Sequence, residues 1–251
     1  MNRINFWGFP VDNLSLEEAL QQIEGFIRTG KPHQHVAINV DKIIKMRKDP
    51  QFRKTIAGCD LITIDGQPLI WVSRLLGQPI KERFGGLDII NGIIPRAADK
   101  GYRIYLLGAR EEVVEKVVEY YKLKFSSLKI AGWHNGYWEA RKEEKIVTEI
   151  RNVKPDILFV AVSSPKKEVF LQKYLRKMDV PFVMGVGGAF DIIAGVTKRA
   201  PKWMQRCSLE WLFRLYQEPL RLWKRYLIED PIFVWLVLKE LVKVRVLGRS
   251  K

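Results

Sequence analysis

Short runs of apolar residues recur along the chain up to residue 186, and longer stretches with helical patterning separate them. Each run is apolar at nearly every position and is bounded by Gly, Pro or Asp, which is typical of strands in a parallel sheet covered on both faces. The alternation of strand and helix predicts a Rossmann-like α/β core, with a mostly parallel sheet and helices on both faces, over residues 1–197. The predicted strands are 35–40, 61–64, 103–108, 129–133, 156–162 and 181–186.

Two of the intervening stretches carry clear helix signals. Ser15 is followed three residues later by Glu18, the spacing of a capping box, in which each side chain accepts from the backbone of the other residue. The segment EEVVEKVVEYYKLKF (111–125) has acids at its start and lysines towards its end, which complements the helix dipole. Both patterns predict helices that cover the sheet.

The residues from 198 onward differ from the rest in charge and aromatic content. They hold 13 Lys and Arg against 5 Asp and Glu, and four of the eight tryptophans. Pro219 and Pro231 are placed as first-turn prolines, so two or three short amphipathic helices are expected. Interleaved Trp and cationic side chains suit lipid headgroups, so residues 198–251 are predicted to form a helical membrane-associating appendage. Packing of some tryptophans against the core is the alternative.

The net charge and the absence of several catalytic motifs limit the classes of function that the chain can have. The net charge of +15 indicates an anionic partner, namely nucleic acid, a phosphate-bearing substrate or lipid headgroups. The chain lacks GxxxxGKS/T, GxSxG, HExxH and DxD, its three histidines have no ligand spacing, and its two cysteines are far apart. These absences argue against a P-loop enzyme, a serine hydrolase, a metal centre and a disulfide framework. No secretory signal is visible, and the apolar run at 232–238 is shorter than the roughly 20 residues that span a bilayer.

Residues at the ends of the predicted strands are the first candidates for a ligand site. In an open α/β sheet, ligands bind beyond the carboxyl ends of strands, where helix N-termini favour phosphate. Gly108 ends one strand before a helix, and Asp65 and Gly66 end another before the helical pattern of 67–77. Asp-Gly is also a common turn pair, so a structural turn is the alternative. On the rim of a pocket, the Asp65 carboxylate can act as a general base.

Short motifs run in order along nearly the whole chain. They are Asn39, Asp65-Gly66, RFGGLDI (83–89), YLLGA (105–109), GWHNGYW (132–138), SPKKEVF (164–170), GVGGAFDIIAG (185–195), KRAPKWM (198–204) and LEWLFRLYQEPLRLWKRYL (209–227). In this order and spacing they resemble the WecG/TagA/CpsF family of bacterial glycosyltransferases. Each fragment is modest, and the resemblance rests on their number and order.

The resemblance implies an inverting transfer, without metal or other cofactor, of a sugar from a nucleotide diphosphate to a sugar on polyprenyl diphosphate. Family members use UDP-N-acetylmannosamine, UDP-N-acetylmannosaminuronate or UDP-hexoses in cell-surface polysaccharide synthesis. The family also implies a peripheral protein at the cytoplasmic side of the membrane, docked through residues 198–251, with no nucleic acid partner. Self-association is a further expectation, although no interface is legible in the sequence.

The resemblance also implies roles for particular residues. Asp65 matches the family's proposed base, which takes the proton of the acceptor hydroxyl. Candidates for holding the leaving diphosphate, as fork donors or exposed amides, are Arg83, Gly108, Arg214, Arg221 and Arg225. Candidates for contacts with sugar or nucleotide are Asn39, Lys167 and Asp191. For any single arginine a solvated helix face is the alternative, and Asp191 could equally cap a helix.

Two positions depart from the family pattern. Where many members carry Thr-x-Asn, this chain has Ala37 before Asn39; where they carry Pro-Lys-Gln-Glu, it has Lys167 in place of Gln. An ammonium group cannot copy the acceptor oxygen of an amide, but it can bind a phosphate or a carboxylated sugar. The identity of the donor sugar is therefore left open.

A non-catalytic basic protein that holds anionic polymer or nucleic acid at a membrane surface is the rival hypothesis, because basic charge and aromatics alone would permit it. The lack of a nucleic-acid-binding motif and the carboxylate predicted at the pocket rim favour the enzyme. A nicotinamide-dependent oxidoreductase is remote, since the chain lacks the glycine fingerprint of that class.

Overall fold

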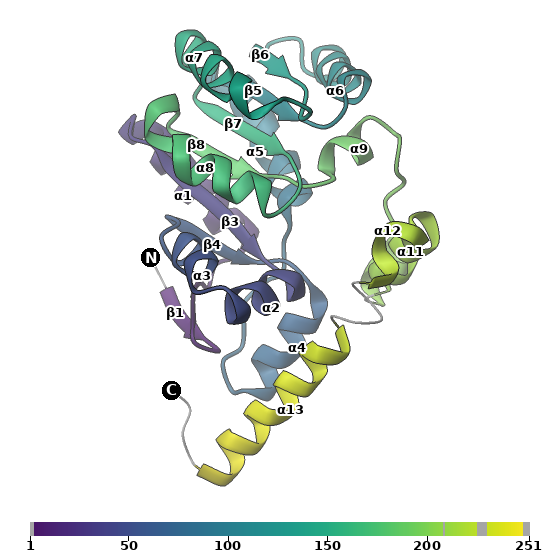
Figure 1. Ribbon diagram of the computed structural model, residues 1–251. Coiled ribbons are helices and arrows are strands. Elements are labelled where there is room, and N and C mark those ends of the chain that lie inside the picture. The colour runs from purple at the N-terminus through teal and green to yellow at the C-terminus, as the bar shows by residue number, and fades with distance from the viewer. Residues whose placement is uncertain (1–2, 208, 225–229, 248–251) are drawn as a thin grey trace.

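The computed structural model of the protein describes residues 3–207, 209–224 and 230–247. Its centre is a six-stranded sheet in the order β4-β3-β8-β7-β5-β6, in which every pair of neighbours is parallel. The Rossmann-like prediction is therefore confirmed (Figure 1). The strands are β3 (His33–Ile38), β4 (Leu61–Ile64), β5 (Arg103–Gly108), β6 (Lys129–His134), β7 (Ile157–Ala161) and β8 (Phe182–Gly185). Two match the predicted bounds, and the others differ by one or two residues at their ends.

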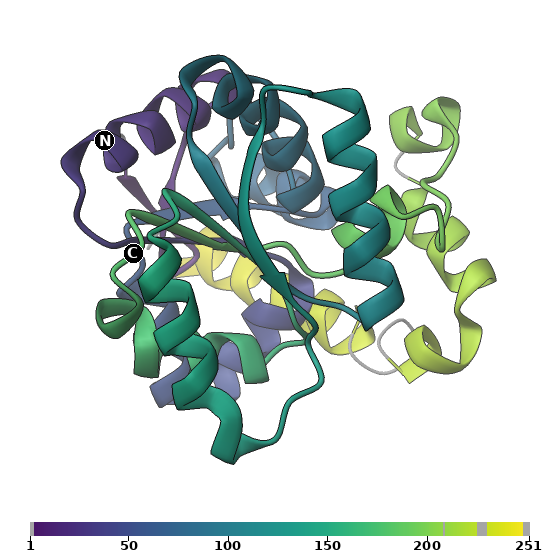
Figure 2. The same cartoon turned by 90° about the horizontal axis from the view of Figure 1, so that it is seen from above.

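Helices cover both faces of the sheet, as Figure 2 shows from above. Those up to the last strand are α1 (Leu16–Thr29), α2 (Val40–Lys48), α3 (Pro50–Ala57), α4 (Gln67–Leu75), α5 (Gly86–Lys100), α6 (Glu111–Lys124), the 3₁₀ turn η1 (Ala140–Lys142), α7 (Glu143–Val153) and α8 (Lys166–Met178). The capping box of Ser15 and Glu18 is present at the start of α1, and the acid-to-lysine segment forms α6, as predicted.

The central strands β5, β7 and β8 are apolar at nearly every position because they face two cores. In β7, Ile157 and Phe159 join a core with α1, α5 and α6, whereas Leu158 and Val160 join a core with α7 and α8. A third core lies over β3 and β4, where Val36 contributes to packing with α2, α3 and α4. Burial on both faces is what the near-continuous apolar runs indicated.

An N-terminal hairpin, which the sequence analysis missed, closes the free side of β4. Its strands β1 (Arg3–Phe6) and β2 (Phe9–Asp12) are antiparallel. Asp12 is buried: it accepts two hydrogen bonds of 2.8 Å from Arg3, and its Oδ2 accepts the N–H of Ile62 at 2.8 Å. One carboxylate thus joins the hairpin to the edge of the sheet.

Replacing Asp12 by Ala is expected to lower the free energy of unfolding by about 3 kcal/mol, because a buried N–H and a guanidinium group lose their acceptor together. Urea unfolding followed by circular dichroism measures the change. Asp12→Asn keeps an acceptor for Ile62 and should lose roughly half as much. Equal losses for the two variants would contradict this account of the hairpin.

Beyond β8 the described residues form helices. These are α9 (Ala189–Ile193), α10 (Lys202–Arg206), α11 (Glu210–Gln217), α12 (Pro219–Lys224) and α13 (Asp230–Leu247). The prediction of two or three short helices after residue 198 was wrong, since α13 alone has 18 residues. Pro219 begins α12 as expected, and Pro231 is the second residue of α13. The division at residue 197 stays a prediction.

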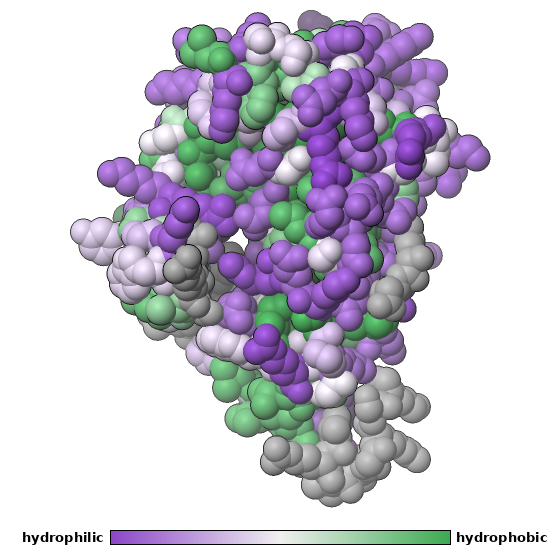
Figure 3. Space-filling view, turned by 180° about the vertical axis from the view of Figure 1, so that it is seen from behind, coloured by the Kyte–Doolittle hydropathy of each residue, from purple (hydrophilic) through white to green (hydrophobic). Residues whose placement is uncertain are grey.

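Helix α13 packs on the core along one side and is open on the other. Phe233 and Val237 are buried, and the ring of Phe233 meets Trp7 of the hairpin turn at 5.7 Å between centroids. Other apolar side chains of α13 are exposed, and they belong to the apolar region at the lower end of the molecule in Figure 3. Within the described residues, no helix combines the length and apolarity that crossing a bilayer needs. Membrane association of this segment stays a prediction.

Candidate active site

A pocket of about 950 Å³ lies where β4, β3 and β8 end. Parallel strands bring their carboxyl ends to one edge of the sheet, so residues distant in sequence meet there. Its walls come from β3, α2, α4, the start of α5, α8, the end of β8 with residues 186–188, α9, α11 and α13. Of the predicted residues, this pocket is lined by Asn39, Asp65, Arg83, Lys167 and Arg214.

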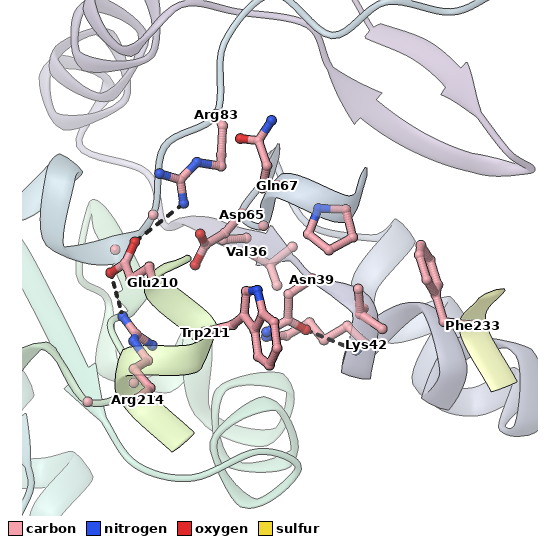
Figure 4. A pocket seen from close by; sticks show the side chains of 18 of the residues that line it. Val36, Asn39, Lys42, Asp65, Gln67, Arg83, Glu210, Trp211, Arg214 and Phe233 are labelled. Carbon is pink, nitrogen blue, oxygen red and sulfur yellow. Dashed lines mark hydrogen bonds and ion pairs between the residues drawn. The ribbon is translucent and has the colours of Figure 1, made fainter. Parts of the chain in front are cut away.

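Asp65 is held at the rim of the pocket directly after β4 (Figure 4). Its N–H donates to Ile38 O at 2.7 Å, which continues the pairing of β3 and β4 by one residue. Its half-buried carboxylate lies over Gly85, where an added Cβ atom would come within 2.9 Å of Asp65 Oδ2. Gly85 is the N-cap of α5, so the carboxylate faces the start of a 15-residue helix. A side chain at 85 would push Asp65 out of this position.

Asn39 begins the next helix along the edge. Its side-chain Oδ1 accepts the backbone N–H of Lys42 at 3.0 Å, which makes Asn39 the N-cap of α2. The cap directs the side chain of Asn39 to the pocket and sets Lys42 one turn further on (Figure 4). Ala37 also lines the pocket, at the position where the family pattern has a hydroxyl.

Three arginines reach the pocket, each next to a carboxylate. Arg83 and Arg214 both contact Glu210 of α11, at 3.6 and 3.3 Å (Figure 4). Arg199 contacts Asp88 Oδ1 at 2.8 Å, and Asp88 in turn accepts the N–H of Gly85. The sequence analysis did not select Arg199 or Glu210; the matched motifs KRAPKWM and LEWLF contained both.

A buried charged cluster lies at the side of the pocket formed by α2 and α8. The ammonium groups of Lys42 and Lys167 stand 3.6 and 3.5 Å from Glu168 Oε1, and the three side chains are less than a tenth exposed. Burial, together with the charge of Lys42, lowers the pKa of Lys167 to about 8. Burial would raise the pKa of Glu168, but the two lysines outweigh it and lower that pKa. Sequence analysis found Lys167 and missed Lys42 and Glu168.

The structure does not place the other four predicted residues at the pocket. Gly108 ends β5 and is buried, and it is not among the pocket-lining residues. Asp191 lies in the short helix α9, whose Ala189 and Ile192 line the pocket although Asp191 does not. Arg221 belongs to α12, and Arg225 lies outside the described residues. The proposed roles of all four stay predictions. Among residues 3–207, 209–224 and 230–247, no group of three or more His, Cys, Asp or Glu is placed to hold a metal ion.

A parallel sheet with a pocket at its carboxyl edge, whose described lining holds five Lys or Arg and five Asp or Glu side chains, has the arrangement in which Rossmann-like α/β enzymes bind their ligands. A model described as Glycosyl transferase WecG/TagA/CpsF family matches residues 4–246, and the chain belongs to this family. The resemblance found in the motifs is confirmed, and the protein is a glycosyltransferase.

Curated relatives cover most of the chain. A Bacillus subtilis protein is 34% identical over 77% of this chain and 74% of its own length, and a Bacillus spizizenii protein is 32% identical over 81% and 78%. A Staphylococcus aureus protein is 26% identical over 97% and 95%. All three are named N-acetylglucosaminyldiphosphoundecaprenol N-acetyl-beta-D-mannosaminyltransferase.

Proposed function

We propose that the protein transfers a sugar from a UDP-linked donor to a sugar carried on polyprenyl diphosphate, with inversion at the anomeric carbon and without a metal ion. The observation that carries the proposal is the half-buried Asp65 carboxylate at the rim of a pocket that three arginines and two lysines also line. The names of the relatives support the acceptor class, because they state an N-acetylglucosaminyl group linked through diphosphate to undecaprenol.

Asp65 is the proposed general base. It takes the proton from the acceptor hydroxyl while that oxygen forms a bond to the anomeric carbon. The bond from this carbon to the donor diphosphate breaks on the opposite face, and its electron pair leaves with UDP. A single displacement of this kind inverts the anomeric centre and forms no covalent intermediate with the protein.

The leaving diphosphate is proposed to be held by arginine. Arg83, Arg199 and Arg214 line the pocket, and guanidinium groups donate paired hydrogen bonds that match phosphate oxygens. Each is now near a carboxylate, so the diphosphate would compete with Glu210 and Asp88 for these donors. Cationic side chains would then supply the charge that a metal ion supplies in other transferases.

A lipid-linked acceptor requires the enzyme to work at a membrane surface. The helices after residue 198 carry exposed apolar side chains, namely Trp203, Trp211, Leu212, Tyr216, Leu220, Trp223, Val234, Trp235, Leu238 and Val242. Residues 198–251 also carry an excess of Lys and Arg. Together these features support peripheral docking to anionic lipid at the cytoplasmic side of the membrane. Self-association of the enzyme belongs to the same proposal.

Leu220→Glu is expected to weaken binding to anionic vesicles about tenfold, because a side chain that is 90% exposed on α12 loses its insertion into lipid and gains a repelled charge. Co-sedimentation with phosphatidylglycerol vesicles measures the affinity. Leu123→Glu makes the same change at a leucine that is 82% exposed on α6, a helix of the α/β region before residue 198. This variant should bind the vesicles as the wild type does. Equal weakening by both variants would show that the membrane contact is not specific to residues 198–251.

The donor and acceptor classes are tested by incubating UDP- and GDP-sugars with polyprenyl-diphosphate-linked N-acetylglucosamine in liposomes, with mass spectrometry of the lipid product. Product from a UDP-sugar supports the proposal. No product from any donor, together with no binding of UDP by calorimetry, would overturn it. Salt-sensitive RNA binding under those conditions would favour the rival, a non-catalytic protein that holds anionic polymer.

A further inference from the structure

The Lys42, Lys167 and Glu168 cluster carries more positive than negative charge at a buried side of the pocket. Two ammonium groups face one carboxylate, and all three residues line the pocket. His35, which also lines it, adds no charge at pH 7, because burial lowers its pKa to about 3. A buried net charge of this kind is costly unless an opposite charge joins it. The net positive charge of the cluster therefore favours the binding of one more anionic group.

Neither lysine is fully engaged by Glu168. Ammonium-carboxylate hydrogen bonds are normally about 2.7–2.9 Å long, and the two contacts here are 3.6 and 3.5 Å. Each ammonium group has three donors. Donors therefore remain for a ligand in the pocket, without loss of the contacts to Glu168.

The backbone holds Lys167 in this position. A Cβ atom on Gly185, the last residue of β8, would lie 2.4 Å from both Cδ and Cε of Lys167. The side chain of Lys167 therefore occupies the space that a Cβ atom at position 185 would fill, so its path past the end of β8 requires glycine there. On the other side, the cap formed by Asn39 fixes the first turn of α2, which carries Lys42. The backbone therefore holds both cations in place at this side of the pocket.

We propose that Lys42 and Lys167 form a subsite for a carboxylate on the transferred sugar, so that the donor is a nucleotide-linked hexuronate. This inference rests on the proposed function and deepens it. The curated relatives are named for transfer of N-acetylmannosamine, a sugar without a carboxylate. The chain would thus use the same fold and acceptor chemistry with an acidic donor.

Position and charge favour the sugar carboxylate over the diphosphate as the occupant. Strands are about 4.8 Å apart and residues about 3.3 Å apart along them, so Gly185, which is level with Val36 of β3, lies roughly 14 Å from Asp65, which follows the Ile38–Ile64 pair. A pyranose ring whose anomeric carbon is near Asp65 can extend its C6 carboxylate across part of this separation towards Lys167. The single excess charge of the cluster matches one carboxylate, whereas a diphosphate carries at least two charges and has Arg83, Arg199 and Arg214 to meet it.

The experiment compares matched pairs of UDP-N-acetylhexosamines and their C6 carboxylates in two measurements. One is kcat/KM for transfer to polyprenyl-diphosphate-linked N-acetylglucosamine, and the other is Kd by calorimetry, with UDP alone as a further ligand. The full-length wild type is expected to prefer the acidic sugar by about 10- to 100-fold, the effect of a hydrogen bond to a charged group. Lys167→Gln should lose most of this preference and leave the Kd for UDP within about twofold.

Lys166→Gln is the matched control. It removes the same charge from the preceding residue, whose ammonium group lies 4.6 Å from the ring centroid of Trp138 and is not part of the pocket lining. The preference for the acidic sugar should survive this change. Lys167→Gln leaves Lys42 and Glu168 as a balanced pair, so the variant should still fold, and thermal melting checks this. If the melting temperature of this variant is lowered, Lys42→Gln gives a second test, because it changes the net charge of the cluster by the same amount.

The outcomes separate this inference from the proposed function. Transfer that favours the neutral sugar, or equal effects of Lys167→Gln on both sugars, would overturn the subsite and leave the glycosyltransferase proposal standing. Weaker binding of UDP alone by Lys167→Gln, to the same extent as the acidic sugar, would assign the cluster to the diphosphate and also overturn it. Preferential binding of the acidic sugar without transfer would support the subsite and count against the proposed reaction.

Discussion

Asp65→Asn is expected to reduce sugar transfer by roughly 10²–10⁴-fold, the usual contribution of a positioned general base. The amide matches the carboxylate in size, so its contact with Gly85 is retained, but it cannot accept the proton of the acceptor hydroxyl. Turnover is measured by lipid-product mass spectrometry, and UDP binding by calorimetry. Binding should change by less than about twofold, because the proposed phosphate contacts come from arginine.

Asp60→Asn is the matched control for this prediction. Asp60 precedes β4 at the strand's other end, where its Oδ2 accepts the N–H of Gln34 at 2.9 Å, and an amide oxygen can accept the same bond. This variant should transfer sugar at the wild-type rate. Undiminished turnover by Asp65→Asn would remove Asp65 from the mechanism, and equal losses in both variants would point to damage to the sheet.

Gly108→Ala is expected to cost about 2–4 kcal/mol of folding free energy. Gly108 has φ +127°, and a Cβ atom there would lie 2.4 Å from Ala161 O and 2.5 Å from Ala161 C on the neighbouring strand. Backbone atoms within a sheet cannot move aside as a flexible side chain can. Urea unfolding of the variant measures the loss.

Gly30→Ala separates the cost of the positive φ from the cost of the close approach to the neighbouring strand. Gly30 also has a positive φ, +65°, at the end of α1, but an added Cβ atom meets nothing within 4 Å, so the cost should be about 1 kcal/mol. Similar losses in the two variants would show that the close approach of β5 and β7 contributes little. Because packing alone requires Gly108, lost activity in its variants would not by itself demonstrate a phosphate contact.

The strands of the main sheet could be predicted because burial on both faces leaves a pattern in the sequence itself. The hairpin could not. Its turn has Trp7 at φ +52° and Gly8 at φ +81°, where Asn-Gly or Asp-Gly is the usual signal. Trp7 is tolerated there because its ring packs on Phe233, a residue of α13 far along the chain. Tertiary packing has overridden local preference.

The candidate site divides in the same way. Asn39 fell inside the predicted strand 35–40 and was found through the family motif alone. Asp65 was found because it directly follows a predicted strand, and parallel strands end at one edge of the sheet. Glu210 could not be found by this rule, since it meets Arg83 only after α11 has packed near the start of α5. The sequence of α2 does not indicate that Lys42 is buried. Its burial depends on the packing of α8, which brings Glu168 beside it. Contacts between helices that are distant in the sequence produce no recognisable spacing of residues, so they could not be predicted from it.

The order of the sheet also bears on how the chain folds. β8 is the last strand to be synthesised, yet it pairs between β3 and β7, in the middle of the sheet. Until it is inserted, the early pair β3-β4 and the later group β7-β5-β6 each present an unpaired edge, and edges of this kind are where chains misassociate. Non-local parallel pairing is also slow. The pocket lies at the junction of β3 and β8, so it forms only when the two halves join, and ligand binding reports the completion of folding.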